Sequence, residues 1–405
     1  MNRTKIQGKK LAWLLTLIYF TSYVTRINFA AVIQEIVTET GYAKSSLSII
    51  LVVLSITYGA GQIINGRLGD KIKPQLLILT GLITATVVNL AFPILSGSIP
   101  LMTLFWGING FAQAMMWPPI VKILVSSAEG EMYNYSIVRV SWGSSFGTIL
   151  IYLIAPLLIS LIGWKAVFYF SSIIGILTVA IWILTMNRID IKTSTPAPIE
   201  STQSKSFKFP REAMLPIIFI GLGIILQGML RDGISSWMPT YLSEVFNLDN
   251  SLSILITVSL AVFSILSFSI SGTIYKKYFK NEVYLGAVIF LVSAISAFTL
   301  FLFFAKGVIL TVISMAIITG CMHGVNLMLI SQVPKRFKSY GNISTISGIL
   351  NSCTYVGSAI FTYGIAVFSD SLGWKYTVGI WVIIAVLGTL SCLIASKPWE
   401  KFYKK

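Results

Sequence analysis

Long apolar runs recur along the whole chain, and this feature restricts the fold more than any other. Each run has about twenty residues, the length at which one helix spans the hydrocarbon core of a bilayer. The sequence lacks the alternating strands of about ten residues that indicate a membrane barrel. It therefore predicts an all-α polytopic membrane protein. Twelve crossings are expected, over residues 11–33, 45–66, 76–96, 101–122, 137–161, 164–186, 213–241, 252–275, 283–305, 308–331, 341–368 and 374–396.

The composition excludes several other classes of protein. Hydrophobic residues make up 55% of the 405 residues and charged residues 11%, whereas a soluble domain carries about a quarter charged residues. His323 is the only histidine, so a HExxH zinc site cannot form. The 3 cysteines lie far apart and form no metal-binding or redox pair. Because no nucleophile with a base and no set of metal ligands is evident, we expect neither an enzyme nor a bound metal or cofactor.

The basic residues are distributed unevenly between the two sides of the predicted crossings. Only four of the loop lysines, Lys44, Lys165, Lys306 and Lys375, fall on the side opposite the termini. The excess of Lys and Arg on the other side predicts that both termini are cytoplasmic and that the protein is multi-pass in the plasma (inner) membrane. The same loops account for the net charge of +16, and no nucleic-acid-binding motif accompanies it. We therefore expect a lipid bilayer around the protein and no nucleic-acid partner.

The only long polar stretch between crossings is 187–212, which is rich in Ser, Thr, Pro and Lys. Such a composition cannot bury a core and indicates a solvated linker. We predict an N-terminal six-helix bundle over 1–186, a cytoplasmic linker over 187–212 and a C-terminal six-helix bundle over 213–405.

The two halves resemble each other. SLIGWK at 160–165 recurs as DSLGWK at 370–375, Arg26 is matched by Arg231, and the basic loop 65–73 is matched by a second one further on. All three pairs are separated by roughly 205 to 210 residues, the weak internal symmetry of transporters that bind substrate between two repeats near the midplane. The sequence therefore predicts two pseudo-symmetric bundles with a central site.

Two arginines are the strongest candidates for that site. Arg26 and Arg231 lie well inside the first predicted helix of each half, where an arginine costs about 2.5–3.5 kcal/mol unless it faces a cavity or a partner. The planar guanidinium group matches phosphate or carboxylate oxygens in a bidentate way. Tyr19, Tyr23 and Arg26 occupy one face of their helix, and Tyr58 of the next helix is expected to point to the same cavity. We predict that these five residues bind an anionic substrate.

Acidic residues are scarce in the crossings. Asp232 is the only one that lies clearly inside a crossing, and it is a candidate for proton coupling because such relays use intramembrane carboxylates. The more ordinary explanation is local charge compensation for Arg231. His323 and Trp117 are further candidates along the transport pathway.

Several segments resemble a known family. GRLGDKIK at 66–73 is similar to the loop signature of the major facilitator superfamily, in which Gly66, Asp70 and Lys71 would form a conformational loop. Segments 19–30, 110–122 and 229–242 resemble the organophosphate:phosphate antiporters of that superfamily, which include glycerol-3-phosphate and hexose-phosphate transporters. The resemblance implies the major facilitator fold. It also assigns Arg26 and Arg231, with the three tyrosines named above, to the substrate site.

The chain departs from the family's pattern at four places. Ile27 replaces a lysine after the first arginine, and Ser236 replaces an acid beyond the second. Phe146 replaces a histidine of the fifth helix, and Gln62 stands where a lysine can occur, although Gln62 remains a candidate along the pathway. The arginine pair is retained, so an anionic substrate is expected, but the particular anion is left open.

The resemblance implies a secondary active transporter that exchanges a phosphorylated metabolite for inorganic phosphate by alternating access. We expect a monomer whose partners are a small organic anion and inorganic phosphate. Two alternatives stay open from the residues. One is a proton- or sodium-coupled symporter of a carboxylate such as a sugar acid, and the other is a membrane sensor that binds a phosphate ester without moving it.

Overall fold

A computed structural model describes residues 8–42, 44–189, 210–248, 250–340 and 343–404. The described chain is almost entirely helical, as the apolar runs predict. Most of the predicted linker, residues 190–209, lies outside the described residues, as do the basic residues Arg3 and Lys5. The division of the chain at 187–212 therefore stays a prediction.

The first half of the chain supplies six predicted crossings. Its elements are α1 (Lys9–Thr40), α2 (Lys44–Lys71), α3 (Pro74–Ala91) with η1 (Phe92–Leu95), α4 (Ile99–Gln113), α5 (Trp117–Ser127), α6 (Gly130–Ile162) and α7 (Lys165–Thr185) with η2 (Met186–Arg188). The second half repeats the pattern with α8 (Arg211–Phe246), α9 (Asn250–Tyr278), α10 (Glu282–Leu302), α11 (Val308–Asn326), η3 (Leu327–Gln332), η4 (Val333–Tyr340), α12 (Ile343–Leu372) and α13 (Trp374–Tyr403).

Ten helices of the described chain are long and apolar enough to cross a membrane on their own. The fourth crossing falls short because it is divided into α4 and α5, of 15 and 11 residues. Prolines follow Trp117 directly at the start of α5, and proline cannot continue the hydrogen-bond ladder of a preceding helix. The helix α1 also falls outside the ten, and it carries Arg26 and Asn28 in its middle. The ten long helices, the α4–α5 pair and α1 together give twelve crossings, as predicted.

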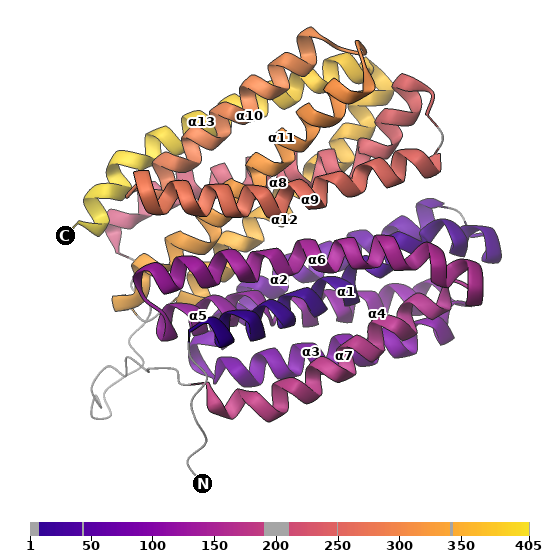
Figure 1. The fold of residues 1–405 in the computed structure, drawn as a ribbon, viewed down its shortest axis with the longest axis horizontal. Coiled ribbons are helices and arrows are strands. Elements are labelled where there is room, and N and C mark those ends of the chain that lie inside the picture. Colours follow the sequence, from indigo (N-terminus) through magenta and orange to yellow (C-terminus); the bar gives the residue numbers. More distant parts are fainter. Residues whose placement is uncertain (1–7, 43, 190–209, 249, 341–342, 405) are drawn as a thin grey trace.

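The helices form two groups that lie side by side, α1 to α7 in one and α8 to α13 in the other (Figure 1). The groups, which we call the N-bundle and the C-bundle, meet mainly where α2 packs on α12 and where α6 packs on α9. A Cβ atom at Gly66 of α2 would lie 2.8 Å from the backbone oxygen of Ser344 in α12. Glycine therefore permits the close approach of the two helices at this point.

The repeat predicted from the sequence has a structural counterpart at the ends of α1 and α8. The indole nitrogen of Trp164 donates to the Glu39 carboxylate at 2.7 Å, and that of Trp374 donates to Glu244 at 2.8 Å. Each tryptophan belongs to one copy of the Gly-Trp-Lys motif, and each glutamate ends the first helix of its half. The same bond thus ties the first helix to the last helix of each bundle.

The helix α1 begins and α13 ends at the opposite end of the molecule (Figure 1). Polar bonds join the two bundles there. Asp70 of α2 accepts hydrogen bonds from the backbone N–H groups of Ser344 and Thr345 at 3.1 and 2.7 Å. These N–H groups belong to the first turn of α12, where a helix leaves its amides without internal partners and favours negative charge. Lys122 supports this cap, with its amine 3.7 Å from Asp70. We call this end of the molecule the terminus side.

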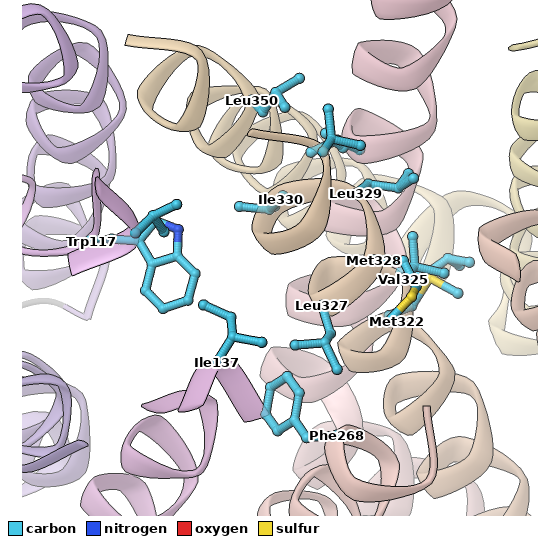
Figure 2. Packing of buried hydrophobic residues seen from close by; sticks show 14 of the residues in the cluster. Trp117, Ile137, Phe268, Met322, Val325, Leu327, Met328, Leu329, Ile330 and Leu350 are labelled. Carbon is cyan, nitrogen blue, oxygen red and sulfur yellow. The ribbon is translucent and has the colours of Figure 1, made fainter. Parts of the chain in front are cut away.

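Further contacts on the terminus side come from the start of α6 and the η3–η4 segment. The Tyr133 hydroxyl donates to the backbone oxygen of Ser331, and Gln332 donates to Asn134 at 3.1 Å. Apolar side chains fill the space between the bundles here. Figure 2 shows Trp117 and Ile137 of the N-bundle beside Leu327, Ile330 and Phe268 of the C-bundle. The bundles are therefore closed against each other on the terminus side.

Candidate functional site

Arg26 lies where α1, α2 and α12 meet, and tyrosines surround it. Its Nη1 donates to the Tyr355 hydroxyl at 3.2 Å. Its Cζ atom lies 4.1 Å from the centroid of the Tyr23 ring and 5.0 Å from that of Tyr58. Among the described residues no carboxylate forms an ion pair with Arg26. The guanidinium group is thus held by aromatic faces and one neutral hydroxyl, which leaves its positive charge uncompensated.

The tyrosine cluster extends from both bundles. Tyr19 contacts Tyr23 and Trp117, with ring centroids 5.2 and 4.7 Å apart, and Tyr58 packs on Tyr355 at 4.3 Å. Tyr355 comes from α12 and was not predicted from the sequence. The only available signal was a tyrosine inside the predicted crossing 341–368, and tyrosines at such places also serve as ordinary packing residues.

Arg231 has a different environment from Arg26. Its Nε donates to Oδ1 of Asp232 at 2.6 Å and its Nη2 donates to Oδ2 at 2.9 Å. The pair is bidentate, the geometry in which a guanidinium group also binds a phosphoryl group. The side chains retain 11% and 28% of their exposure, so solvent reaches both. This arrangement is the local charge compensation that the sequence suggested as the ordinary role of Asp232.

A small cavity joins the two halves of this region. It is lined from the N-bundle and the C-bundle together, by Tyr19, Tyr23, Trp117, Ser141, Ser144, Arg231, Phe268, His323 and Asn326. Its volume of about 10 Å³ is roughly the room of one water molecule. The ring of His323 packs against Phe268 with centroids 5.2 Å apart. In this conformation an organic phosphate does not fit, and the bundles must separate to admit one.

The cavity connects the surroundings of the two arginines. Tyr23 contacts Arg26 and also lines the cavity into which Arg231 points. Tyr23 and Tyr355 both lie within electrostatic reach of both guanidinium groups. The structure thus brings the two predicted arginines to one region between the bundles, separated by tyrosine side chains.

The remaining sequence candidates lie at the edge of this region or outside it. Gln62 is fully buried where α2 packs on Gly348 of α12, and its amide has no hydrogen-bond partner among the described residues. Of the conformational loop, Gly66 and Asp70 form the contact between the bundles described above, whereas Lys71 is exposed.

The other three residues that depart from the family's pattern lie in different parts of the structure. Ile27 packs into the apolar core of the N-bundle. Phe146 is 37% exposed and stands beside Trp142, and Ser236 is exposed beyond Arg231 along α8.

A larger hollow of about 770 Å³ lies elsewhere, between α2 and α4. Its lining is almost entirely apolar and contains neither arginine, so it is unsuited to an anion. The candidate site is therefore the small polar cavity between the bundles rather than this larger apolar hollow.

Comparison with known proteins agrees with this arrangement. The family model of the Major Facilitator Superfamily matches residues 15–362, which is most of the chain. The chain belongs to this superfamily. It is similar to the glycerol-3-phosphate transporter of Bacillus subtilis strain 168, with 26% identity over 387 residues that cover 88% of this chain and 85% of the relative. It is also 30% identical over 200 residues to a probable hexose phosphate transport protein of Chlamydia muridarum, covering 48% of this chain and 42% of the relative.

A solved structure has the same fold. The outward-facing crystal structure of a bacterial homologue of the iron transporter ferroportin superposes with a TM-score of 0.76 at 13% sequence identity, covering 95% of this chain and 98% of that one. The match to the family model shows that the protein is a multi-pass membrane transporter rather than an enzyme, and the two sequence relatives named above are a glycerol-3-phosphate transporter and a probable hexose phosphate transport protein.

Proposed function

We propose that the protein imports a phosphorylated metabolite in exchange for inorganic phosphate. The observation that carries this proposal is the uncompensated charge of Arg26, held between tyrosine rings at the junction of the two bundles. A guanidinium group at membrane depth is costly unless it faces a cavity or a partner, and a bound anion would be such a partner for Arg26. The names of the sequence relatives, a glycerol-3-phosphate transporter and a hexose phosphate transport protein, support a phosphate ester as that anion.

In this proposal the phosphoryl oxygens bind the fork of Arg26 in a bidentate way, and Arg231 approaches from the other bundle. Hydroxyl groups of Tyr19, Tyr23 and Tyr58 donate to the remaining oxygens. The contacts of Asp70 and Tyr133 on the terminus side break when the bundles rock, and the site then opens to that side. Exchange follows because only a loaded carrier places an anion between the bundles to offset their positive charge.

The surroundings of the protein are part of the proposal. The excess of Lys and Arg in the loops of the terminus side supports a plasma (inner) membrane carrier with both termini in the cytoplasm. We propose that it works as a monomer, since the site is built from the two bundles of one chain.

Counterflow in proteoliposomes tests the exchange. Vesicles preloaded with inorganic phosphate should take up labelled glycerol-3-phosphate much faster than unloaded vesicles. Arg26→Lys should lower uptake by about 10- to 100-fold. Lysine cannot form the bidentate pair, so one charged hydrogen bond to the phosphoryl group, worth about 1.5–3 kcal/mol, is lost. Arg139→Lys is the matched control, since Arg139 stacks over Trp142 in α6 and lies outside the cavity lining. Full uptake by the Arg26→Lys protein would contradict the proposed site.

Symport of a carboxylate such as a sugar acid is a second candidate. One observation favours it: Asp232 neutralises Arg231, and the single free fork of Arg26 suits one carboxylate. In that case a proton gradient should drive uptake of gluconate, and preloaded phosphate should leave the rate unchanged.

A further inference from the structure

The fork of Arg231 is occupied by a side chain of its own helix. Both oxygens of Asp232 accept from the Nε and Nη2 edge of the guanidinium group, at 2.6 and 2.9 Å. A phosphoryl group that bound Arg231 side-on would need the same two donors, Nε and Nη2, whereas Nη1 and Nη2 form the second, end-on edge of the guanidinium group. Asp232 and a phosphoryl group that binds side-on therefore compete for one edge of Arg231.

Arg26 provides an internal comparison because it stands at the matching place in the other half. The residue that follows it is Ile27, which packs into the apolar core of the N-bundle. No carboxylate among the described residues pairs with Arg26. The two arginines thus differ in one respect that matters for anions: among the described residues Arg26 has no carboxylate partner, whereas Arg231 is paired with Asp232.

We propose that Asp232 is a resident counter-anion that determines the affinity for phosphate: the phosphoryl group that bridges both arginines binds Arg231 side-on and displaces Asp232 from that edge. This inference rests on the proposed function, since it requires that the substrate reach both bundles. A monocarboxylate uses one fork only, so it is bound by Arg26 and leaves the pair of Arg231 and Asp232 intact.

The surroundings of Asp232 allow the displacement. Its side chain retains 28% of its exposure and is therefore not locked in a dry core. The Ser358 hydroxyl of α12 lies within hydrogen-bonding reach of the carboxylate, and His323 of α11 is close to it. Once released from Arg231, the carboxylate has a partner on α12 and access to water, and it can pair with Arg231 again when the ligand leaves.

The test measures binding to the purified full-length chain in lipid nanodiscs by isothermal titration calorimetry, at fixed pH and low salt. Inorganic phosphate, glycerol-3-phosphate and gluconate are the probes. Asp232→Asn should tighten the Kd for both phosphates by about tenfold, as expected if the carboxylate fills the fork about nine-tenths of the time. The Kd for gluconate should change by less than about threefold.

Two outcomes overturn the inference. One is unchanged or weaker phosphate binding by the Asp232→Asn protein. The other is an equal gain for phosphate and gluconate, which would reflect the loss of a nearby negative charge rather than competition for the fork. If neither phosphate binds the wild-type protein, the proposed function fails as well. Binding of phosphate by the wild type without a gain in the variant rejects the inference alone.

A double-mutant cycle separates competition from a structural role. In an Arg231→Gln background, Asp232→Asn should leave the Kd for phosphate within about twofold, because no fork remains to be released. Glu400→Gln is the matched control, as it neutralises a carboxylate that pairs with Lys404 at the end of α13. If the asparagine variant does not fold, Asp232→Ser carries the same measurement, with the same tightening expected and its absence contradicting the inference.

Discussion

At the scale of residues, Arg26 and Arg231 stand at matching places in the two halves but have different partners. The difference comes from the one residue that follows each arginine. Ile27 gives Arg26 no partner, so aromatic faces and the Tyr355 hydroxyl hold it, whereas Asp232 pairs with Arg231. Tyr355 matters because it comes from the other bundle. Through this residue the C-bundle contacts the uncompensated cation of the N-bundle directly.

Tyr355→Phe should weaken phosphate binding by about 2- to 10-fold, because it removes one hydrogen bond of about 0.5–1.5 kcal/mol that orients Arg26. The packing on Tyr58 is kept by the phenylalanine ring, so the melting temperature should barely change. Calorimetric Kd values check the first expectation and thermal unfolding checks the second. Tyr376→Phe, on an exposed residue of α13, is the control. Unaltered phosphate binding would remove Tyr355 from the site.

At the scale of elements, the sequence predicted the helices better than their interruptions and their partners. The fourth crossing was predicted as one segment, 101–122, whereas the structure divides it into α4 and α5 at Trp117-Pro118-Pro119, where proline cannot continue a preceding helix. No proline lies within η3, the π-helical stretch Leu327–Gln332, whose residues are apolar except for Ser331 and Gln332. The pairing of Asp70 with the start of α12 was also beyond prediction, because it depends on how two distant helices meet.

That pairing predicts a conformational effect. Asp70→Asn should loosen the terminus side, because the amide loses the negative charge that complements the first turn of α12. A cysteine introduced at Asn134 reports this opening through its labelling by a thiol reagent. The labelled fraction should rise at least about twofold, which corresponds to a small shift in the balance of conformations. Lys71→Gln, at the exposed neighbour, should leave labelling unchanged. Equal labelling in all three proteins would show that the cap does not hold the bundles together.

At the scale of the whole molecule, the internal repeat produces two bundles, and the candidate site lies between them. Each bundle ties its first helix to its last through a tryptophan and a glutamate, so each is expected to move as a unit. The bundles meet mainly at the α2–α12 and α6–α9 surfaces, and the cavity is lined from both bundles. The structure, with a cavity of about 10 Å³ and a closed terminus side, is one conformation of the two bundles. Transport requires a second conformation in which the site is open to the terminus side.

A cross-link between the bundles therefore should stop transport without unfolding the protein. Asn134→Cys and Gln332→Cys place thiols at a contact where the native side chains are 3.1 Å apart, in a background whose Cys321, Cys353 and Cys392 are replaced by alanine. A short, cleavable bifunctional thiol reagent should abolish phosphate counterflow in proteoliposomes, and reduction of the reagent should restore it. Either single-cysteine protein, treated identically, should keep its rate because nothing joins its bundles. Undiminished counterflow in the cross-linked protein would contradict rocking of the bundles, since the contact of Asn134 with Gln332 must open whenever the site faces the terminus side.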